Sequence, residues 1–358
     1  MGSASILNVK VEKVLLAKPR GFCAGVEMAI KALGWMVRVF EPPVYCYHEI
    51  VHNKVVVERF SALGVIFVDD PSQVPFGSPV MLSAHGSAPE VVTAARDIAS
   101  ISINAVCPLV TKVHHEVKTR AAKGFEIIYV GHHGHDEALG TMAVAPEKVH
   151  LVESIAELEA TSIEAGEVAL IAQTTLAMDE WRAIADRAEE LYPGLWMPNK
   201  SDLCFATTNR QAAVRALASR ADVMVVIGSA NSSNTNALEK VARATSNARV
   251  VRINTVADLP TDLSGTVAIT AGASAPEELV DQVIARLKPR LGTEEVTVID
   301  EDEYFPPPRE LREFLKSLAQ VAAFAFGEDP EVESPLARDS AISASAILAE
   351  LANYPASV

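Results

Sequence analysis

Three cysteines of the chain lie in one recurring local setting. Cys23 lies in Pro-Arg-Gly-Phe-Cys-Ala-Gly, Cys107 in Ala-Val-Cys-Pro-Leu-Val-Thr and Cys204 in Asp-Leu-Cys-Phe-Ala-Thr, and they are 84 and 97 residues apart. Each follows an extended stretch and precedes a helix-like one, so all three could meet at one end of a layered α/β body. Three convergent thiolates can hold an iron–sulfur cluster and leave one iron without a protein ligand. Such an open iron indicates substrate chemistry.

Polar side chains follow several of the expected strands. His52, His85 and His135 stand after the strand-like runs 45–50, 80–83 and 127–130. Ligands of parallel sheets gather beyond the carboxyl ends of the strands. Helix N-capping is an alternative explanation for serines at such junctions, although free helix amides also attract phosphate. The other polar residues at these junctions are Thr174, Ser232, Ser233, Asn234 and Ser274.

Glu137 lies two residues after His135 in the loop Gly-His-His-Gly-His-Asp-Glu. A carboxylic acid there could deliver protons to a bound substrate, and an ordinary surface loop residue is the alternative interpretation. The loop also resembles the His-x-His-x-Asp-His motif of binuclear zinc hydrolases, but Glu137 and Ala138 stand where that motif needs Asp and His. Cys46 lies within Val-Tyr-Cys-Tyr and is interpreted as a packing residue.

Composition and charge narrow the class of protein. The 358 residues carry a net charge of −15, which argues against general binding to nucleic acid or to anionic membranes. No apolar run approaches the ~20 residues that span a bilayer, and no signal peptide is evident. Four cysteines make no disulfide framework, so a reducing, cytoplasmic location is expected.

Short apolar runs alternate with amphipathic helical stretches along most of the chain, which predicts an α/β fold with parallel-type sheets. Residues 82–91 also resemble residues 269–279, and both read as a strand followed by a Ser-x-x-Glu capping box. With the cysteine spacing, this indicates three similar α/β lobes of roughly 90 residues in a trefoil around a shared centre. The expected lobes cover residues 13–105, 106–203 and 204–303, and the N-terminal strand could pair with the third. Residues 304–358 are expected to form a partly mobile C-terminal appendage, with an extended connector at 305–312 and a short helix at 341–352.

The ordered motifs of the chain resemble the 4-hydroxy-3-methylbut-2-enyl diphosphate reductase family from about residue 13 to about residue 315. The resemblance is carried by Pro19-Arg20-Gly21-Phe22-Cys23-Ala24-Gly25, His48-Glu49-Ile50-Val51-His52-Asn53, Ser83-Ala84-His85-Gly86, Cys107-Pro108-Leu109-Val110-Thr111-Lys112, Gln173-Thr174-Thr175, Cys204-Phe205-Ala206-Thr207-Thr208-Asn209-Arg210-Gln211 and Thr270-Ala271-Gly272-Ala273-Ser274.

The resemblance implies reductive removal of the allylic hydroxyl of (E)-4-hydroxy-3-methylbut-2-enyl diphosphate, the last step of the methylerythritol phosphate route to isoprenoids. It implies a [4Fe–4S] cluster on Cys23, Cys107 and Cys204 with one iron not bound by the protein. Glu137, Thr174 and His135 would serve proton delivery. Ferredoxin or flavodoxin would supply electrons, and Lys18, Arg20, Lys112 and Arg210 are candidates for a docking patch. The diphosphate would be bound by His52, His85, His135, Thr174, Ser232, Ser233, Asn234 and Ser274.

Two rival functions stay open on the sequence. An iron–sulfur hydro-lyase of the aconitase kind also uses an open iron but needs no net electrons. A non-catalytic iron–sulfur sensor that binds a diphosphate metabolite is the second. Dependence of turnover on a reductant separates the reductase from the hydro-lyase, and the effect of Glu137→Gln on turnover separates an enzyme from a sensor.

Overall fold

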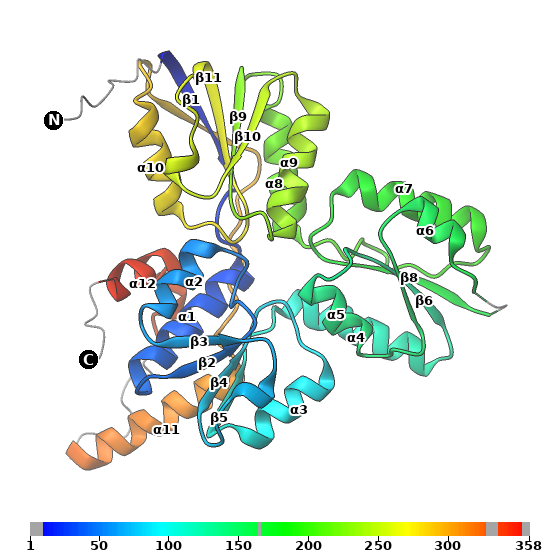
Figure 1. Ribbon diagram of the computed structural model, residues 1–358, viewed down its shortest axis with the longest axis vertical. Coiled ribbons are helices and arrows are strands. Elements are labelled where there is room, and N and C mark those ends of the chain that lie inside the picture. The colour runs from blue at the N-terminus through cyan, green and yellow to red at the C-terminus, as the bar shows by residue number, and fades with distance from the viewer. Residues whose placement is uncertain (1–9, 164–165, 327–335, 353–358) are drawn as a thin grey trace.

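The computed structural model describes residues 10–163, 166–326 and 336–352, which form three lobes around a common centre (Figure 1). Each lobe is built on its own sheet, and every strand pairing in these residues is parallel. The predicted α/β class with three lobes on parallel sheets is therefore confirmed. Strands β8 and β9 are buried along their whole length, as expected for continuous apolar runs covered by helices on both faces.

The first lobe contains a sheet in the order β3-β2-β4-β5. Its strands are β2 (Val44–Tyr47), β3 (Val65–Val68), β4 (Pro79–Leu82) and β5 (Ile101–Asn104). Its helices are α1 (Ala24–Val39), α2 (Lys54–Ser61), the 3-10 turn η1 (Pro71–Gln73) and α3 (Pro89–Ile98). Cys46 lies in β2 with no exposed surface, within the core of this lobe, which confirms its interpretation as a packing residue.

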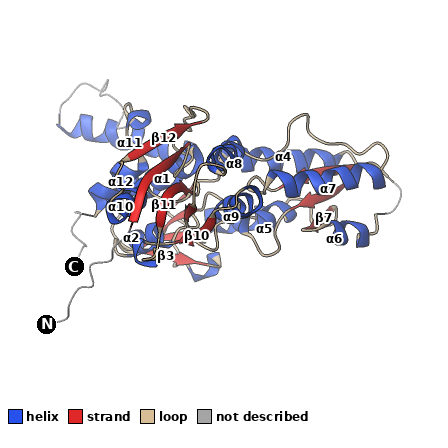
Figure 2. Ribbon diagram, turned by 90° about the horizontal axis from the view of Figure 1, so that it is seen from above, coloured by secondary structure: helices blue, strands red, loops and turns tan. Residues whose placement is uncertain are grey.

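The second lobe contains a sheet in the order β7-β6-β8 and extends away from the other two lobes (Figure 2). Its elements are α4 (Pro108–Ala122), β6 (Glu126–Val130), α5 (Asp136–Met142), β7 (Val149–Val152), α6 (Ile155–Ala160), β8 (Val168–Ala172) and α7 (Met178–Leu191).

The third lobe contains a sheet in the order β10-β9-β11-β1-β12. The N-terminal strand lies inside this sheet, between the central strand β11 on one side and the edge strand β12 on the other. The expected pairing of that strand with the third lobe is thus what the structure has. The elements are β1 (Lys10–Lys18), α8 (Phe205–Leu217), β9 (Val223–Ile227), α9 (Ser233–Thr245), β10 (Arg249–Ile253), η2 (Val256–Asp258), β11 (Ser264–Ala271), α10 (Glu277–Leu287) and β12 (Thr293–Thr297).

The chain passes from one lobe to the next at each of the three cysteines. Cys23 separates β1 of the third sheet from α1, Cys107 separates β5 of the first sheet from α4, and Cys204 precedes α8. The backbone N–H of each cysteine donates to a carbonyl beyond a strand of the lobe that the chain is leaving. The acceptors are Ala273 O for Cys23 (3.2 Å), Ala84 O for Cys107 (3.0 Å) and Thr174 O for Cys204 (2.9 Å). These bonds hold the three crossings at the centre of the molecule.

The C-terminal segment contributes to the core of the first lobe. Its elements are α11 (Arg309–Phe326), η3 (Asp339–Ala341) and α12 (Ala344–Leu351). The interpretation of 305–312 as an extended connector is wrong from Arg309 onward, because α11 begins directly after three prolines. Leu311, Leu315 and Leu348 are buried in the core around α1, and the Lys31 ammonium is 2.8 Å from the Asp339 carboxylate, with both side chains buried. The predicted partial mobility concerns residues 304–358, a range that lies partly outside the described residues.

The predicted capping boxes at 87–90 and 274–277 are wrong. Helix α3 begins after Ala88 and α10 after Pro276, and neither has a side-chain cap. Pro89 is the first residue of α3, where its preset φ suits a helix start, whereas Pro276 stands just before α10 as its N-cap. Among the described helices, none is both long and apolar enough to cross a membrane.

Candidate active site

One cavity at the junction of the lobes is lined by every side chain that the sequence predicts for the site. The first lobe contributes two histidines, the second a histidine, an acid and a threonine, and the third serines and an asparagine, while the cysteines come from the crossings. These residues are Cys23, Cys107, Cys204, His52, His85, His135, Glu137, Thr174, Ser232, Ser233, Asn234 and Ser274.

Each of the three cysteines is the N-cap of a helix, namely α1, α4 and α8. Helix N-termini carry partial positive charge and free amides, which favours a thiolate. Burial and the neighbouring Cys23 work against ionisation of the other two thiols. They raise the pKa of Cys107 far above its usual value and the pKa of Cys204 to about 12. Thiols in such a site ionise readily only when a cation is bound, and a metal cluster supplies that charge.

Gly25 provides a test of whether the cysteines fit a cluster. A Cβ atom at this position would lie 2.7 Å from Cys107 Sγ and 4.0 Å from Cys23 Sγ. The two sulfurs therefore converge over a backbone that has no side chain, and the open space beside them belongs to the cavity. A soft sulfur donor set with room at its centre fits an iron–sulfur cluster.

Glu137 lies in the first turn of α5 and is 3% exposed, so its interpretation as an ordinary surface loop residue is wrong. Burial raises the pKa of its carboxyl to about 7, against two hydrogen bonds from Thr174 that lower it. The Thr174 backbone N–H donates to Oε1 at 2.7 Å and the hydroxyl donates to Oε2 at 3.0 Å. The carboxyl is fixed in position and can exchange a proton near neutral pH.

His135 is the N-cap of α5, and its Nδ1 accepts from the Glu137 backbone N–H at 3.1 Å. Burial, together with the charge of His52, lowers the pKa of His135 to about 3, so the ring is neutral at physiological pH. Because Nδ1 accepts, the neutral ring carries its proton on Nε2, which is left as a hydrogen-bond donor.

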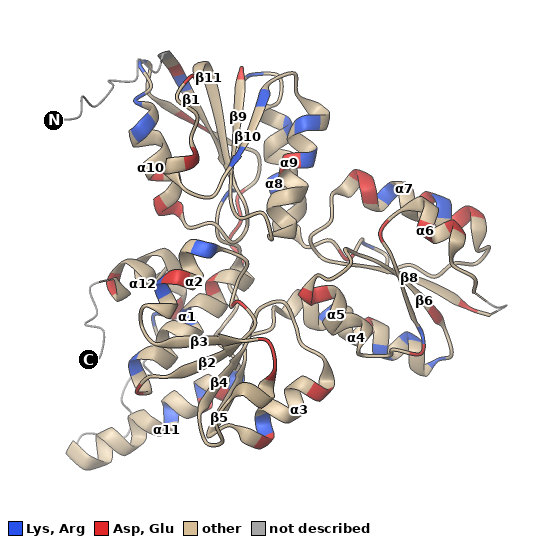
Figure 3. Ribbon diagram, in the orientation of Figure 1, with Lys and Arg blue, Asp and Glu red and all other residues tan. Residues whose placement is uncertain are grey.

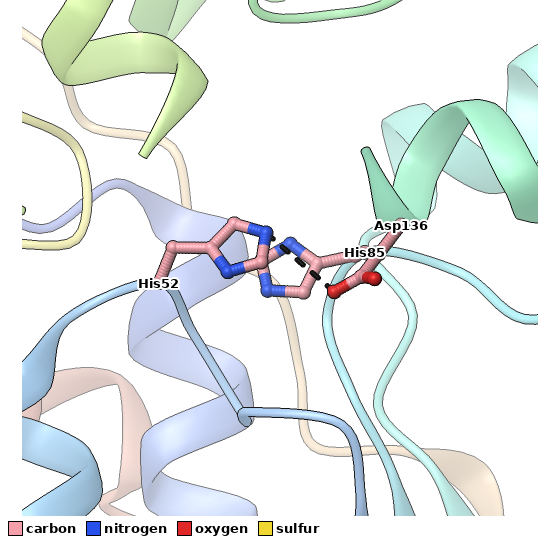
Figure 4. A group of neighbouring side chains, drawn as sticks. All are labelled: His52, His85 and Asp136. Carbon is pink, nitrogen blue, oxygen red and sulfur yellow. Dashed lines mark ion pairs between the residues drawn. The ribbon is translucent and has the colours of Figure 1, made fainter. Parts of the chain in front are cut away.

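Three histidine rings stack against one another in the cavity. The rings of His52 and His85 are parallel with centroids 3.8 Å apart, and the His135 ring meets His52 edge-on at 5.1 Å. Nε2 of His52 and Nε2 of His85 are buried without a hydrogen-bond partner. Asp136 approaches the same pair from the second lobe (Figure 4). Unpartnered buried nitrogens of this kind are suited to a polar ligand.

The hydroxyl groups of Ser274 and Ser233 contact the other lobes, whereas the amide of Asn234 is held within the third lobe. The Ser274 hydroxyl donates to His52 O at 2.9 Å, and Ser233 Oγ is 2.9 Å from Thr175 Oγ1. Ser232 caps α9, as the sequence indicates, whereas Ser274 caps no helix. Asn234 accepts from the Ala273 N–H at 2.9 Å through its amide oxygen.

Sequence reasoning missed several residues at this centre. Thr207 lies against Cys204, with its Oγ1 3.0 Å and its N–H 3.3 Å from the sulfur, and Thr175 and Phe305 also line the cavity. A threonine three residues after an N-cap cysteine is a signal that could have identified Thr207. Phe305 follows from no local pattern, because it approaches from the C-terminal segment.

The basic residues considered for partner docking are all paired with acids. Lys18 lies 3.3 Å from Asp300, Arg20 contacts Glu277, and Lys112 lies 3.4 Å from Asp202. Arg210 is 1% exposed and binds Glu301 at 2.9 Å. It also donates to Gly21 O and Phe22 O, directly before Cys23, so it supports the cysteine loop and cannot contact a partner.

The zinc-hydrolase alternative is not supported by the positions of its histidines. His133 is largely exposed and pairs with Glu157 at 2.8 Å, while His135 faces the cavity. Successive histidines that diverge in this way cannot share a binuclear centre.

Fold and site together are typical of α/β metal-cluster enzymes with a polar ligand pocket beside the cluster ligands. The family model described as "LytB protein" matches residues 14–288, and the chain belongs to this family. A relative from Rhodopirellula baltica, named 4-hydroxy-3-methylbut-2-enyl diphosphate reductase, is 46% identical over 86% of this chain and 98% of its own. A relative of the same name from Mycobacterium leprae is 41% identical over 85% of this chain and 94% of its own.

A solved structure shares the arrangement of the lobes. The E-1-hydroxy-2-methyl-but-2-enyl-4-diphosphate reductase from Plasmodium falciparum is 30% identical, covers 86% of this chain and 99% of its own, and has a TM-score of 0.82.

Proposed function

We propose that this chain is a 4-hydroxy-3-methylbut-2-enyl diphosphate reductase, which converts (E)-4-hydroxy-3-methylbut-2-enyl diphosphate to isopentenyl and dimethylallyl diphosphates. This is the last step of the methylerythritol phosphate route. The observation that carries the proposal is the single cavity wall that combines three N-cap cysteines, a buried acid and the polar residues of all three lobes. The names of the relatives agree with it.

Cys23, Cys107 and Cys204 would hold a [4Fe–4S] cluster, and iron–sulfur dependence is typical of the family. No fourth cysteine lines the described cavity, since Cys46 is buried in the core of the first lobe, so one iron would have no protein ligand. When bound, such a cluster supplies electrons and a Lewis-acidic iron beside the substrate.

Glu137 is the residue proposed to move protons. The reaction consumes two electrons and two protons, breaks the allylic C–O bond and releases the hydroxyl as water. Glu137, with a pKa of about 7, can donate to the departing hydroxyl, and Thr174 holds its carboxyl in place through two hydrogen bonds. Nε2–H of His135 lies in the same cavity and can orient the substrate.

The diphosphate would be bound without a large positive field. Histidine, serine and asparagine provide N–H and O–H donors, which suits a protein with a net charge of −15. The proposed donors come from all three lobes, so a bound diphosphate would join them. These residues are His52, His85, His135, Thr174, Ser232, Ser233, Asn234 and Ser274.

The electrons would come from an external donor, for which we propose ferredoxin or flavodoxin. The basic residues beside the cysteines are already engaged by acids, so docking does not rest on them as a free cationic patch. The cytoplasmic location stays a prediction.

The test is an anaerobic assay of the reconstituted chain with reduced methyl viologen and the hydroxylated diphosphate, after iron and sulfide have been counted. We expect both five-carbon diphosphates, and we expect Cys107→Ser to lose both iron and turnover. Turnover that does not depend on the reductant would support the aconitase-like hydro-lyase. A loaded cluster without turnover would support the sensor.

A further inference from the structure

His52 has a carboxylate facing each of its ring nitrogens. Glu49 Oε2 lies 3.4 Å from Nδ1, and Asp136 Oδ2 lies 3.6 Å from Nε2. The second distance is too long for a direct hydrogen bond, so Nε2 remains without a partner although it is buried. Stacking on His85 fixes the plane of the ring, and the view of this group shows Asp136 directed toward His52 (Figure 4).

Each carboxylate is itself held by a further side chain. Asn231 of the third lobe donates to Glu49 at 2.8 Å, and Nδ1 of His48 is 2.8 Å from Asp136 Oδ1. The hydrogen bond of His52 lowers the pKa of Glu49. Burial opposes ionisation of Asp136, but the contact with His48 and the neighbouring histidines prevail and its pKa is lowered. Both carboxylates are therefore ionised at neutral pH.

These contacts form one series across the three lobes, with His52 at its centre. Asn231 lies in the third lobe, Asp136 in the second, and His48, Glu49 and His52 in the first. Neither Glu49 nor Asp136 lines the cavity in which the diphosphate would lie. They contact His52 from its edge, which leaves the cavity side of the ring to the ligand.

We propose that Glu49 and Asp136 are positioning residues that fix the orientation of His52 for binding of the diphosphate. Because Nδ1–H donates to the Glu49 carboxylate, Nε2 is the nitrogen left for the ligand, and it carries a proton when the ring is doubly protonated. A ring held from both edges and from one face presents this nitrogen to a phosphate oxygen without first losing rotational freedom. Asp136 lies in α5 beside Glu137 and its carboxylate faces this ring, so one helix carries both the acid and a group that orients the anion site. The inference rests on the proposed function and names how its anion site is organised.

The test uses the full-length, cluster-loaded chain and inorganic diphosphate as the probe in anaerobic titration calorimetry. We expect Asp136→Asn and Glu49→Gln each to weaken diphosphate binding about tenfold, by analogy with the roughly 10–100-fold loss of metal affinity or activity when a residue that orients a metal-binding histidine is changed. Iron content, sulfide content and melting temperature should stay at the wild-type values. In turnover, KM should rise more than kcat falls. Asp97→Asn removes an equal charge from an exposed position of the first lobe, which also carries Glu49 and His52, and should bind as the wild type does.

A double-mutant cycle with His52→Ala shows whether Asp136 acts through that ring. In the His52→Ala background we expect Asp136→Asn to cause no further loss of diphosphate affinity. An equal loss in both backgrounds would overturn the positioning role, as would tighter binding by Asp136→Asn, which would mean that the carboxylate repels the anion. Affinity equal to that of Asp97→Asn would overturn it as well. Failure of the proposed function is separable, because the wild-type chain would then bind diphosphate without reductive turnover.

Discussion

The protonation state of Glu137 follows from its position rather than from its residue type. The carboxyl is buried at the start of α5 and receives two hydrogen bonds from Thr174, and burial outweighs them in setting its pKa at about 7. The neighbouring His135, with its pKa at about 3, does not titrate in the same range. We therefore assign a pH effect on proton delivery near neutrality to Glu137, the residue proposed to move protons.

The first prediction concerns pH. We expect kcat to fall as the pH rises through about 7, because the donor must be protonated and its pKa is about 7. The same raised pKa makes this group stabilise the fold most at low pH, and that contribution is lost as the pH rises through about 7. Glu137→Gln should reduce kcat by about 10²–10⁴-fold while iron and sulfide remain bound.

Thr174→Val provides the control for this assignment. It removes the hydroxyl donor that lowers the pKa of Glu137, so the pH at which kcat falls should move to a higher value. Two results together would contradict the assignment of this pH dependence to Glu137. One is a fall of kcat at the same pH in Thr174→Val as in the wild type, and the other is the same fall in the residual activity of Glu137→Gln.

The second prediction uses a pair of glycines in α1. The methyl group of Gly25→Ala would lie 2.7 Å from Cys107 Sγ, so we expect a lower iron and sulfide content after reconstitution. Helix propensity favours alanine by up to about 1 kcal/mol, so the helix itself should not suffer. Gly34→Ala is the matched control, since its methyl group would meet Ile347 of α12 at 2.8 Å. Gly34→Ala should have a lower melting temperature but the iron content of the wild type. Equal iron loss in both variants would contradict the prediction.

At the scale of elements, the features that could be predicted are those that depend on residues close together in the sequence. The setting of Cys23, Cys107 and Cys204 indicated three equivalent junctions, and each cysteine proves to be an N-cap at a crossing between lobes. The short helix α5 was missed because Gly134 and two histidines before it read as a loop. Helix α11 was missed because its buried face pairs Leu311 and Leu315 with the first lobe, a partner far away in sequence.

The third prediction concerns the C-terminal helices. Leu348 of α12 is 1% exposed in the core of the first lobe, so Leu348→Ala should lower the free energy of unfolding by about 2–5 kcal/mol. Leu318 of α11 is 45% exposed, and Leu318→Ala should change the free energy of unfolding by at most about 0.5 kcal/mol. Denaturant unfolding of both variants is the measurement. Equal stability of the two would mean that the segment is only loosely attached.

At the scale of the whole molecule, polar contacts rather than a common core join the lobes at the cavity mouth. Asn231 reaches Glu49 from the third lobe, and Asp136 reaches His48 from the second. Charged residues of both signs alternate over the outer helices, whereas the last turns of α11 carry none (Figure 3). Contacts of this kind allow the lobes to move relative to one another, because few apolar side chains must separate.

The fourth prediction follows from this arrangement. A diphosphate that bonds to residues of all three lobes should draw them together, so small-angle scattering of the cluster-loaded chain should give a smaller radius of gyration when the substrate is bound. Water would then be excluded from the reacting groups. An unchanged radius of gyration at saturating substrate would contradict lobe closure.

The cysteines at the three crossings have a mechanical consequence. A cluster bound there would link the three crossings covalently, so losing it would remove a cross-link between the lobes as well as a cofactor. Damage by oxygen should then appear first as faster protease cleavage and amide exchange beside Cys23, Cys107 and Cys204, while the sheets of the individual lobes stay protected.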